Sequence, residues 1–247
     1  MSKKLELRNQ RDGTVINQTS SKQEKRLGNS ITILRDILIK QHNIGIRHES
    51  QWLLRDIVND LKTIHRDTAF TFKFQSSSMR PDGGILSLLD KQGNAYPILI
   101  TEVKNQGTND IRSLEGKEKQ AKGNAIERLG KNVIGFRTAL LKESIFPFVC
   151  FGDGCDFAED SSILDRVITI AMFGELNTIH LHNQGSSGQF NRGSFYFRVP
   201  LWTEQDMLPI MKEIAERSIL YYFSKYGERN FRCKDLHFNL PIRTSQT

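Results

Sequence analysis

Two apolar runs with a turn between them constrain this chain more than any other feature. GILSLLD (residues 84–90) and YPILITEVK (96–104) flank the turn-like segment KQGNA. Apolar runs joined by a short segment with Gly and Asn predict an antiparallel β-hairpin. Residues two apart in a strand point to the same face, so Glu102 and Lys104 project together while Val103 faces the core. The hairpin therefore predicts a sheet with a charged pair near one edge.

Apolar residues at spacings of three and four predict helices on both sides of the hairpin. In chain order these helices cover 31–63 in two pieces, 123–143, 163–173 and about 203–222, the last opening with the capping-type sequence TEQD. Further strands are predicted at 69–75, where three Phe residues alternate, at 146–152 and within 188–200. This order predicts a single α/β domain with a central mixed β-sheet flanked by helices.

Charge and composition indicate the kind of partner and the compartment. The 247 residues include 35 Lys and Arg against 28 Asp and Glu, and this net charge of +7 favours an anionic partner. Seven basic and three acidic residues lie in residues 1–30, which lack hydrophobic periodicity. We expect a mobile basic arm over 1–30, either a solvated tail or a contact to DNA, and a catalytic and DNA-recognition domain over 31–247. Neither a membrane-length apolar run nor a signal peptide is present, so we expect a cytoplasmic protein without membrane contacts.

The segment SSSMRPDGG (76–84), directly before the hairpin, admits two interpretations. In a plain turn, Pro81 fixes φ, Asp82 hydrogen-bonds nearby backbone, and the two glycines supply unusual dihedral angles. In a site, Asp82 meets Glu102 across the hairpin, and the two carboxylates hold a hard cation such as Mg²⁺. That cation would polarise a phosphoryl oxygen and activate water, while Lys104 orients the water or stabilises charge. Pro81-Asp82, nineteen further residues and Glu102-Val103-Lys104 form the PD-(D/E)xK pattern of nucleases.

The start of the helix at GNAIER (123–128) also has two interpretations. Asn124 is a favoured N-cap, and Glu127 three residues later completes a capping box. Alternatively, Asn124 and Arg128 share one face of the helix end and hydrogen-bond to base edges in a major groove. In that interpretation Glu127 accepts from a base amino group and holds the Arg128 guanidinium. The geometry of a helix does not choose between these alternatives.

PDGG, ITEVKNQG, GNAIER-x-x-KN and FPFVCFGDGCDF occur in this order within residues 70–157. In order and spacing they resemble the EcoRI-type restriction endonucleases of the PD-(D/E)xK nuclease superfamily. The resemblance implies metal-binding roles for Asp82 and Glu102 and a catalytic role for Lys104. It implies that an inner AATT is recognised by Asn124, Ala125, Glu127 and Arg128. It also implies that the DNA backbone near the scissile phosphate is contacted by Ser78 and Arg80.

The chain departs from the family pattern just before this motif. Lys122 stands where EcoRI itself has a small residue, and Gln120 and Ala121 precede it. These three positions fall where the outer base pair would be recognised, so the outer base is not carried over from the family. Gly123, the first residue of GNAIER, is expected among the base-recognition residues. The polar tract 109–123 also differs, and the resemblance implies that this tract helps to surround the DNA.

From the residues and the resemblance we expect a homodimeric, Mg²⁺-dependent type II restriction endonuclease. It would hydrolyse double-stranded DNA at a palindrome with an AATT core and leave 5′ overhangs, with a cognate DNA methyltransferase in the same system. Two-fold symmetry of the target calls for two-fold symmetry of the protein. The alternatives are a DNA-repair or structure-specific nuclease with the same catalytic core, and a non-catalytic DNA-binding regulator that retains the fold.

Overall fold

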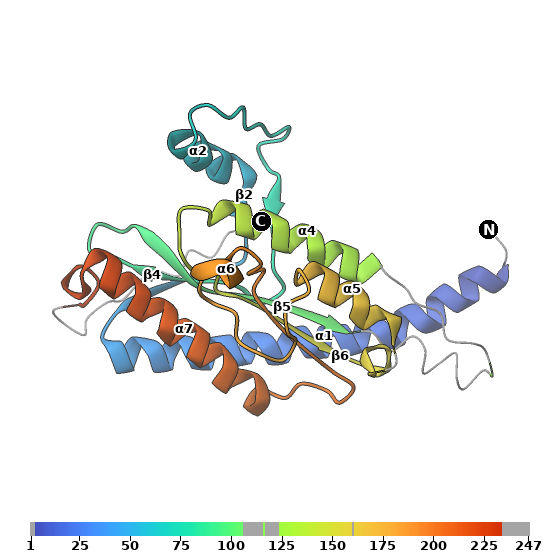
Figure 1. Cartoon of the computed structure of the whole chain (residues 1–247). Helices are drawn as coiled ribbons and strands as arrows, with labels where there is room; N and C mark the ends of the chain where they lie inside the picture. Colours follow the sequence, from blue (N-terminus) through green and yellow to red (C-terminus); the bar gives the residue numbers. More distant parts are fainter. Residues whose placement is uncertain (1–2, 106–115, 117–123, 160, 234–247) are drawn as a thin grey trace.

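A five-stranded mixed sheet forms the centre of the protein, as the sequence predicts. The computed structural model of the chain describes residues 3–105, 116, 124–159 and 161–233 (Figure 1). The sheet has the order β1-β4-β5-β6-β7. Its strands are β1 (Gly45–Glu49), β4 (Gly84–Leu89), β5 (Ala95–Asn105), β6 (Phe148–Asp153) and β7 (Ser194–Arg198). β1, β4 and β5 pair antiparallel, whereas β5, β6 and β7 pair parallel, so β5 joins the two halves of the sheet.

Helices cover both faces of the sheet. Figure 1 shows α1 (Lys3–His42) and α7 (Glu204–Tyr226) on one face, and α4 (Asn124–Ala139) and α5 (Ser162–Ile170) on the other. The shorter elements are α2 (Leu54–Ile64), β2 (Trp52–Leu53), β3 (Ser78–Met79), α6 (Gly185–Gly188) and the 3₁₀ turns Cys155–Phe157 and Glu228–Asn230. The helices on the two faces bury two separate hydrophobic clusters, and the described helices include none long and apolar enough to cross a membrane.

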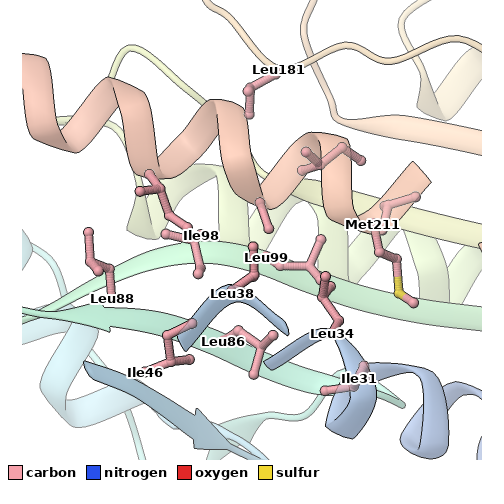
Figure 2. Packing of buried hydrophobic residues seen from close by; sticks show 14 of the residues in the cluster. Ile31, Leu34, Leu38, Ile46, Leu86, Leu88, Ile98, Leu99, Leu181 and Met211 are labelled. Carbon is pink, nitrogen blue, oxygen red and sulfur yellow. The ribbon is translucent and has the colours of Figure 1, made fainter. Parts of the chain in front are cut away.

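Alternation along the strands divides the sheet between these clusters. Leu86, Leu88 and Val103 pack toward α1 and α7, whereas Ile85 and Ile100 pack toward α4 and α5. Figure 2 shows the first cluster, in which Leu residues of α1 meet the aliphatic side chains of β4 and β5 and Met211 of α7. Because both faces are covered, β6 is buried along its whole length. The strands β4 and β5 therefore lie between two apolar layers.

The N-terminal segment differs from the expected arm because α1 passes through residue 30 without a break. Gln23 and Leu27 are buried in the same helix as Ile31, so the packed part of α1 begins before the expected boundary. The sequence obscures this packing because Leu27 is an isolated apolar residue among polar neighbours. Only the residues before Gln23 remain available as an arm, and their contact with DNA stays a prediction. Figure 1 shows the first turns of α1 extending beyond the sheet.

Two further differences concern residues 43–75. The predicted helical region 31–63 is interrupted by β1 and β2, and only residues 54–64 form α2 in its second half. The predicted strand 69–75 was wrong, because these residues form no strand and Phe74 is exposed. Alternation of Phe gives a strand only where a neighbouring strand supplies hydrogen bonds. The remaining predicted elements are confirmed, including the capping box of α7 at Thr203 and Asp206.

Candidate active site and recognition helix

The loop that precedes β4 is both a turn and the support of a site. The Gly84 N–H donates to Pro81 O at 3.0 Å, and Gly84 has a φ of 79°, which favours glycine. A Cβ on Gly84 would lie 2.7 Å from the backbone oxygen of Glu49. A Cβ on Gly83 would overlap Thr101 Oγ1 and lie 2.5 Å from Ile31 Cδ1. Gly83 therefore lets the loop pass close to α1 and Gly84 lets it pass close to β1, which brings Asp82 to the end of β5.

The structure brings Asp82, Glu102 and Lys104 together, as the hairpin pattern predicts. The Lys104 Nζ donates to Glu102 Oε1 at 2.6 Å and to Asp82 Oδ2 at 3.0 Å. It also donates to the Val103 carbonyl at 3.0 Å. Backbone bonds fix both carboxylates, since the Asp82 N–H donates to Glu102 Oε2 and the Val103 N–H donates to Asp82 Oδ2. Asp82 Oδ2, Glu102 Oε1 and Val103 O thus converge on the Lys104 ammonium.

Burial differs strongly among these three side chains. The exposed fraction is 2% for Glu102, 13% for Lys104 and 29% for Asp82, so the site opens to solvent on the Asp82 side. Burial raises the pKa of the Glu102 carboxyl, while the charge of Lys104 acts in the opposite direction. Burial disfavours the Lys104 ammonium, but the charges of Glu102 and Asp82 outweigh this effect and raise its pKa. The lysine is consequently held as a cation against two carboxylates.

The donor set fits a hard divalent cation. Mg²⁺ prefers oxygen ligands and is commonly bound by one or two carboxylates while it keeps several waters. Asp82 Oδ2, Glu102 Oε1 and Val103 O already surround a cation in the form of the Lys104 ammonium. Among the described residues there is no cluster of three His, Cys, Asp or Glu side chains, so two carboxylates and a carbonyl are the protein ligands on offer.

A fourth side chain at this site has no role assigned from the sequence. Asn132 of α4 donates through Nδ2 to Glu102 Oε1 at 3.2 Å. Asn132 is the Asn of the KN pair in GNAIER-x-x-KN, so the motif contained the residue, but nothing in the local spacing indicates its partner thirty residues earlier. The helix that carries GNAIER is therefore hydrogen-bonded to a carboxylate of the site.

The two predicted backbone-contact residues share a partner. Ser78 Oγ donates to Gln51 Oε1 at 3.0 Å, and the Arg80 guanidinium donates to the same oxygen at 2.7 Å. Ser78 pairs with Leu53 in the small β2–β3 ribbon, whereas Arg80 is exposed two residues before Asp82. Gln51 was not predicted from the sequence. The ribbon places one hydroxyl and one guanidinium on the approach to the carboxylates, and contact with DNA remains a prediction.

The helix α4 begins at Asn124 and buries one face against the sheet. Its buried residues are Ile126, Leu129, Val133 and Phe136. Glu127 and Arg128 are exposed in the first turns, where both interpretations of GNAIER place them. Lys122 and Gly123 lie outside the described residues, as do the side chains of Asn124 and Ala125. Base recognition by this end of the helix therefore stays a prediction, with a capping box as the alternative.

A mixed sheet that brings Pro81-Asp82 and Glu102-Val103-Lys104 together is characteristic of the restriction-endonuclease-like fold. The chain belongs to the EcoRI restriction endonuclease family, because the family model described as restriction endonuclease EcoRI matches residues 10–163, more than half of the chain.

Two similar curated proteins are both named type II restriction enzymes. The chain is 34% identical over 179 residues to the type II restriction enzyme RsrI of Cereibacter sphaeroides, covering 59% of this chain and 64% of the relative. It is 32% identical over 131 residues to the type II restriction enzyme EcoRI of Escherichia coli, covering 50% of this chain and 47% of the relative. The chain thus spans less than two thirds of the length of either relative. The range matched by the family model includes the segment that carries the site.

Proposed function

We propose that this protein is a type II restriction endonuclease that hydrolyses phosphodiester bonds of double-stranded DNA with Mg²⁺. The observation that carries the proposal is the contact of Lys104 with both Asp82 and Glu102 at the solvent-facing end of the β4–β5 hairpin. Two carboxylates and a lysine on rigid strands are a suitable arrangement for metal-assisted attack on a phosphate. Membership in the EcoRI family supports this chemistry over other uses of the same side chains.

Asp82, Glu102 and the Val103 carbonyl would hold the metal ion. When bound, the ion supplies Lewis-acid polarisation of a phosphoryl oxygen and a water of lowered pKa. The Lys104 ammonium occupies the point where these oxygens converge, so metal binding requires the ammonium to leave it. Lys104 is then available to stabilise negative charge that develops on the phosphate. Ser78 and Arg80 would position the DNA backbone beside Asp82.

Base recognition would reside at the N-terminal end of α4. The family resemblance implies that an AATT core would be contacted by Asn124, Ala125, Glu127 and Arg128. Exposure of Glu127 and Arg128 on a helix anchored by its opposite face supports this role. Gly123 would also belong to the recognition segment, and Lys122 would lie at the outer base pair, where a lysine can donate to guanine O6 and N7. Cleavage of each strand on the 5′ side of the core would leave 5′ overhangs.

A palindromic target calls for a two-fold symmetric protein, so the acting form would be a homodimer. The substrate would be cytoplasmic DNA, and a methyltransferase of the same specificity would protect the host genome. The net charge of +7 agrees with an anionic substrate.

A plasmid digest with and without Mg²⁺ tests the proposal against its alternatives. Discrete fragments that depend on Mg²⁺ would support a restriction endonuclease, and sequencing of their ends would give the core, the outer base and the overhang. A smear of products would indicate a nuclease without sequence preference. Binding without any cutting, in the presence of Mg²⁺ or Mn²⁺, would indicate a non-catalytic regulator and overturn the proposal.

A further inference from the structure

A single hydrogen bond connects the helix proposed to contact bases with the carboxylate that is most deeply buried in the site. Asn132 Nδ2 lies 3.2 Å from Glu102 Oε1, the same oxygen that accepts from Lys104 Nζ at 2.6 Å. Glu102 is otherwise contacted by the backbone N–H of Asp82. Among the described side chains of α4, that of Asn132 is therefore hydrogen-bonded directly to the catalytic group.

Asn132 lies on the helix face that leads to the proposed base-contacting residues. Arg128 is four residues before Asn132 and Asn124 is eight residues before it. Residues four apart are neighbours on a helix surface. With a rise of 1.5 Å per residue, the backbone positions of Asn124 and Asn132 are about 12 Å apart along one rigid element. A displacement of the helix start is consequently transmitted to the amide of Asn132.

The helix also contacts the segment that carries the other carboxylate. Gly135 packs so closely on Met79 that a Cβ at position 135 would overlap the Met79 sulfur. Met79 ends β3, three residues before Asp82. The helix α4 therefore touches both chain segments that supply carboxylates, through the neighbouring residues Asn132 and Gly135, which are three apart. Its buried face, which includes Leu129 and Val133, packs in the hydrophobic cluster on this side of the sheet.

We propose that Asn132 is a positioning residue that couples the DNA-contacting end of α4 to the orientation of the Glu102 carboxylate. This inference rests on the proposed function, because it requires that base contacts set the position of α4. It also requires that Glu102 binds the metal ion needed for cleavage. When the helix start is seated on its target, the Asn132 amide holds Oε1 in the metal-binding orientation. When the helix is displaced by a wrong base pair, this bond lengthens and the carboxylate is held less well.

The variant Asn132→Leu removes the amide and keeps a similar side-chain volume, whereas Asn132→Gln keeps an amide donor. Thr138→Val is the matched control, because Thr138 is also half-buried on α4 but its hydroxyl donates only within the helix, to Ile134 O at 2.8 Å. Thermal unfolding is measured for each variant. If Asn132→Leu does not fold, Asn132→Ala replaces it, since that change removes the amide without adding apolar bulk.

Two measurements distinguish positioning from a purely structural role. The first is Mn²⁺ binding without DNA, followed by electron paramagnetic resonance, in which Asn132→Leu should bind several-fold more weakly than the wild type. The second is the ratio of single-turnover cleavage rates for the target and for a site with one changed base pair. This ratio should fall about tenfold or more in Asn132→Leu, recover in part in Asn132→Gln and stay unchanged in Thr138→Val.

Each outcome decides the inference. Rates that fall equally on both sites, or an unchanged Mn²⁺ affinity in Asn132→Leu, would overturn the coupling and leave the proposed function intact. A wild-type protein that cuts no DNA would remove the proposed function, and the coupling with it. A lower discrimination ratio together with weaker Mn²⁺ binding, rescued by Asn132→Gln, would support the coupling.

Discussion

The ammonium of Lys104 lies between the carboxylates of Glu102 and Asp82, at 2.6 Å and 3.0 Å from their nearest oxygens. Glu102 is almost fully buried, so without this cation it would carry an unpaired charge in a low-dielectric environment. The same contacts place the lysine where a metal ion would have to bind.

Loss of either carboxylate should abolish cleavage. Asp82→Ala and Glu102→Ala each remove one protein ligand of the metal, and we expect the cleavage rate to fall by at least about a thousandfold. Binding of the target in Ca²⁺, measured by gel shift, should remain detectable. Asp165→Ala, which removes an exposed carboxylate on α5, is the control and should cut normally. Full-rate cutting by either site variant would refute the assignment.

Removal of the Lys104 charge should have opposite effects on metal binding and on cleavage. Lys104→Met removes the cation that occupies the converging oxygens, so Mn²⁺ should bind more tightly than to the wild type. Cleavage should be severely impaired, because no ammonium remains to stabilise charge on the phosphate. Calorimetric titration with Mn²⁺ and a plasmid digest measure the two effects. Weaker Mn²⁺ binding in a folded variant would contradict the proposed exchange of ammonium for metal.

Substitution by alanine should change the stability of the protein in opposite directions at Gly83, which packs against α1, and at Gly28, which lies within α1. Gly83→Ala would overlap Thr101 and press on Ile31, and we expect a loss of about 1–3 kcal/mol in the free energy of unfolding. Gly28→Ala has nothing within 4 Å of its new methyl group and lies inside α1, so it should stabilise by up to about 1 kcal/mol. Urea denaturation measures both changes. A neutral Gly83→Ala would show that the loop can move away from α1.

Base specificity should depend on the start of α4. A good bidentate base contact is worth about 1–3 kcal/mol, so Asn124→Ala should lose roughly that much preference for AATT. Lys122→Ala should relax only the outer position. Sequenced ends of wild-type fragments provide the decisive measurement, because a core other than AATT would refute the roles carried over to this helix regardless of the catalytic residues.

The first turns of α1 should contribute affinity without specificity. Deletion of residues 1–20 removes four basic and two acidic residues and stops short of the buried Gln23 and Leu27. If these turns contact phosphates, affinity should fall alike for all sequences, and the slope of log K against log salt should become shallower. An unchanged slope would show that the segment is a solvated tail.

The sequence predicts those parts of the fold in which the pattern is local. The hairpin of β4 and β5, the helix α4 and the meeting of Asp82 with Glu102 all follow from spacing within single segments. The edge strand β1 was not predicted, because Ile46 is its only buried residue and its hydrogen bonds come from β4. The false strand at 69–75 shows the reverse case, in which alternation exists but no partner strand pairs with it.

Contacts between distant segments are the part of the site that the sequence did not predict. Asn132 belongs to the sequence motif, but the motif indicates no role for it, because Asn132 meets its partner Glu102 only when α4 packs on β5. Gln51 was missed for the same reason, since its contacts to Ser78 and Arg80 depend on the β2–β3 ribbon. A side chain that acts through another residue leaves no periodic signal in its own segment.

The alternation of residues 100–104 at the end of β5 has a consequence for how such a protein can fail. A slip of one residue against β4 would turn Glu102 and Lys104 into the cluster beneath α1 and α7 and turn Val103 toward the α4 side. Burying separated charges there would cost several kcal/mol per group, a large share of the 5–15 kcal/mol that stabilises a typical domain. A misregistered chain would therefore be much less stable than the native form, so the register of β5 protects the site from a folded but incorrectly arranged alternative.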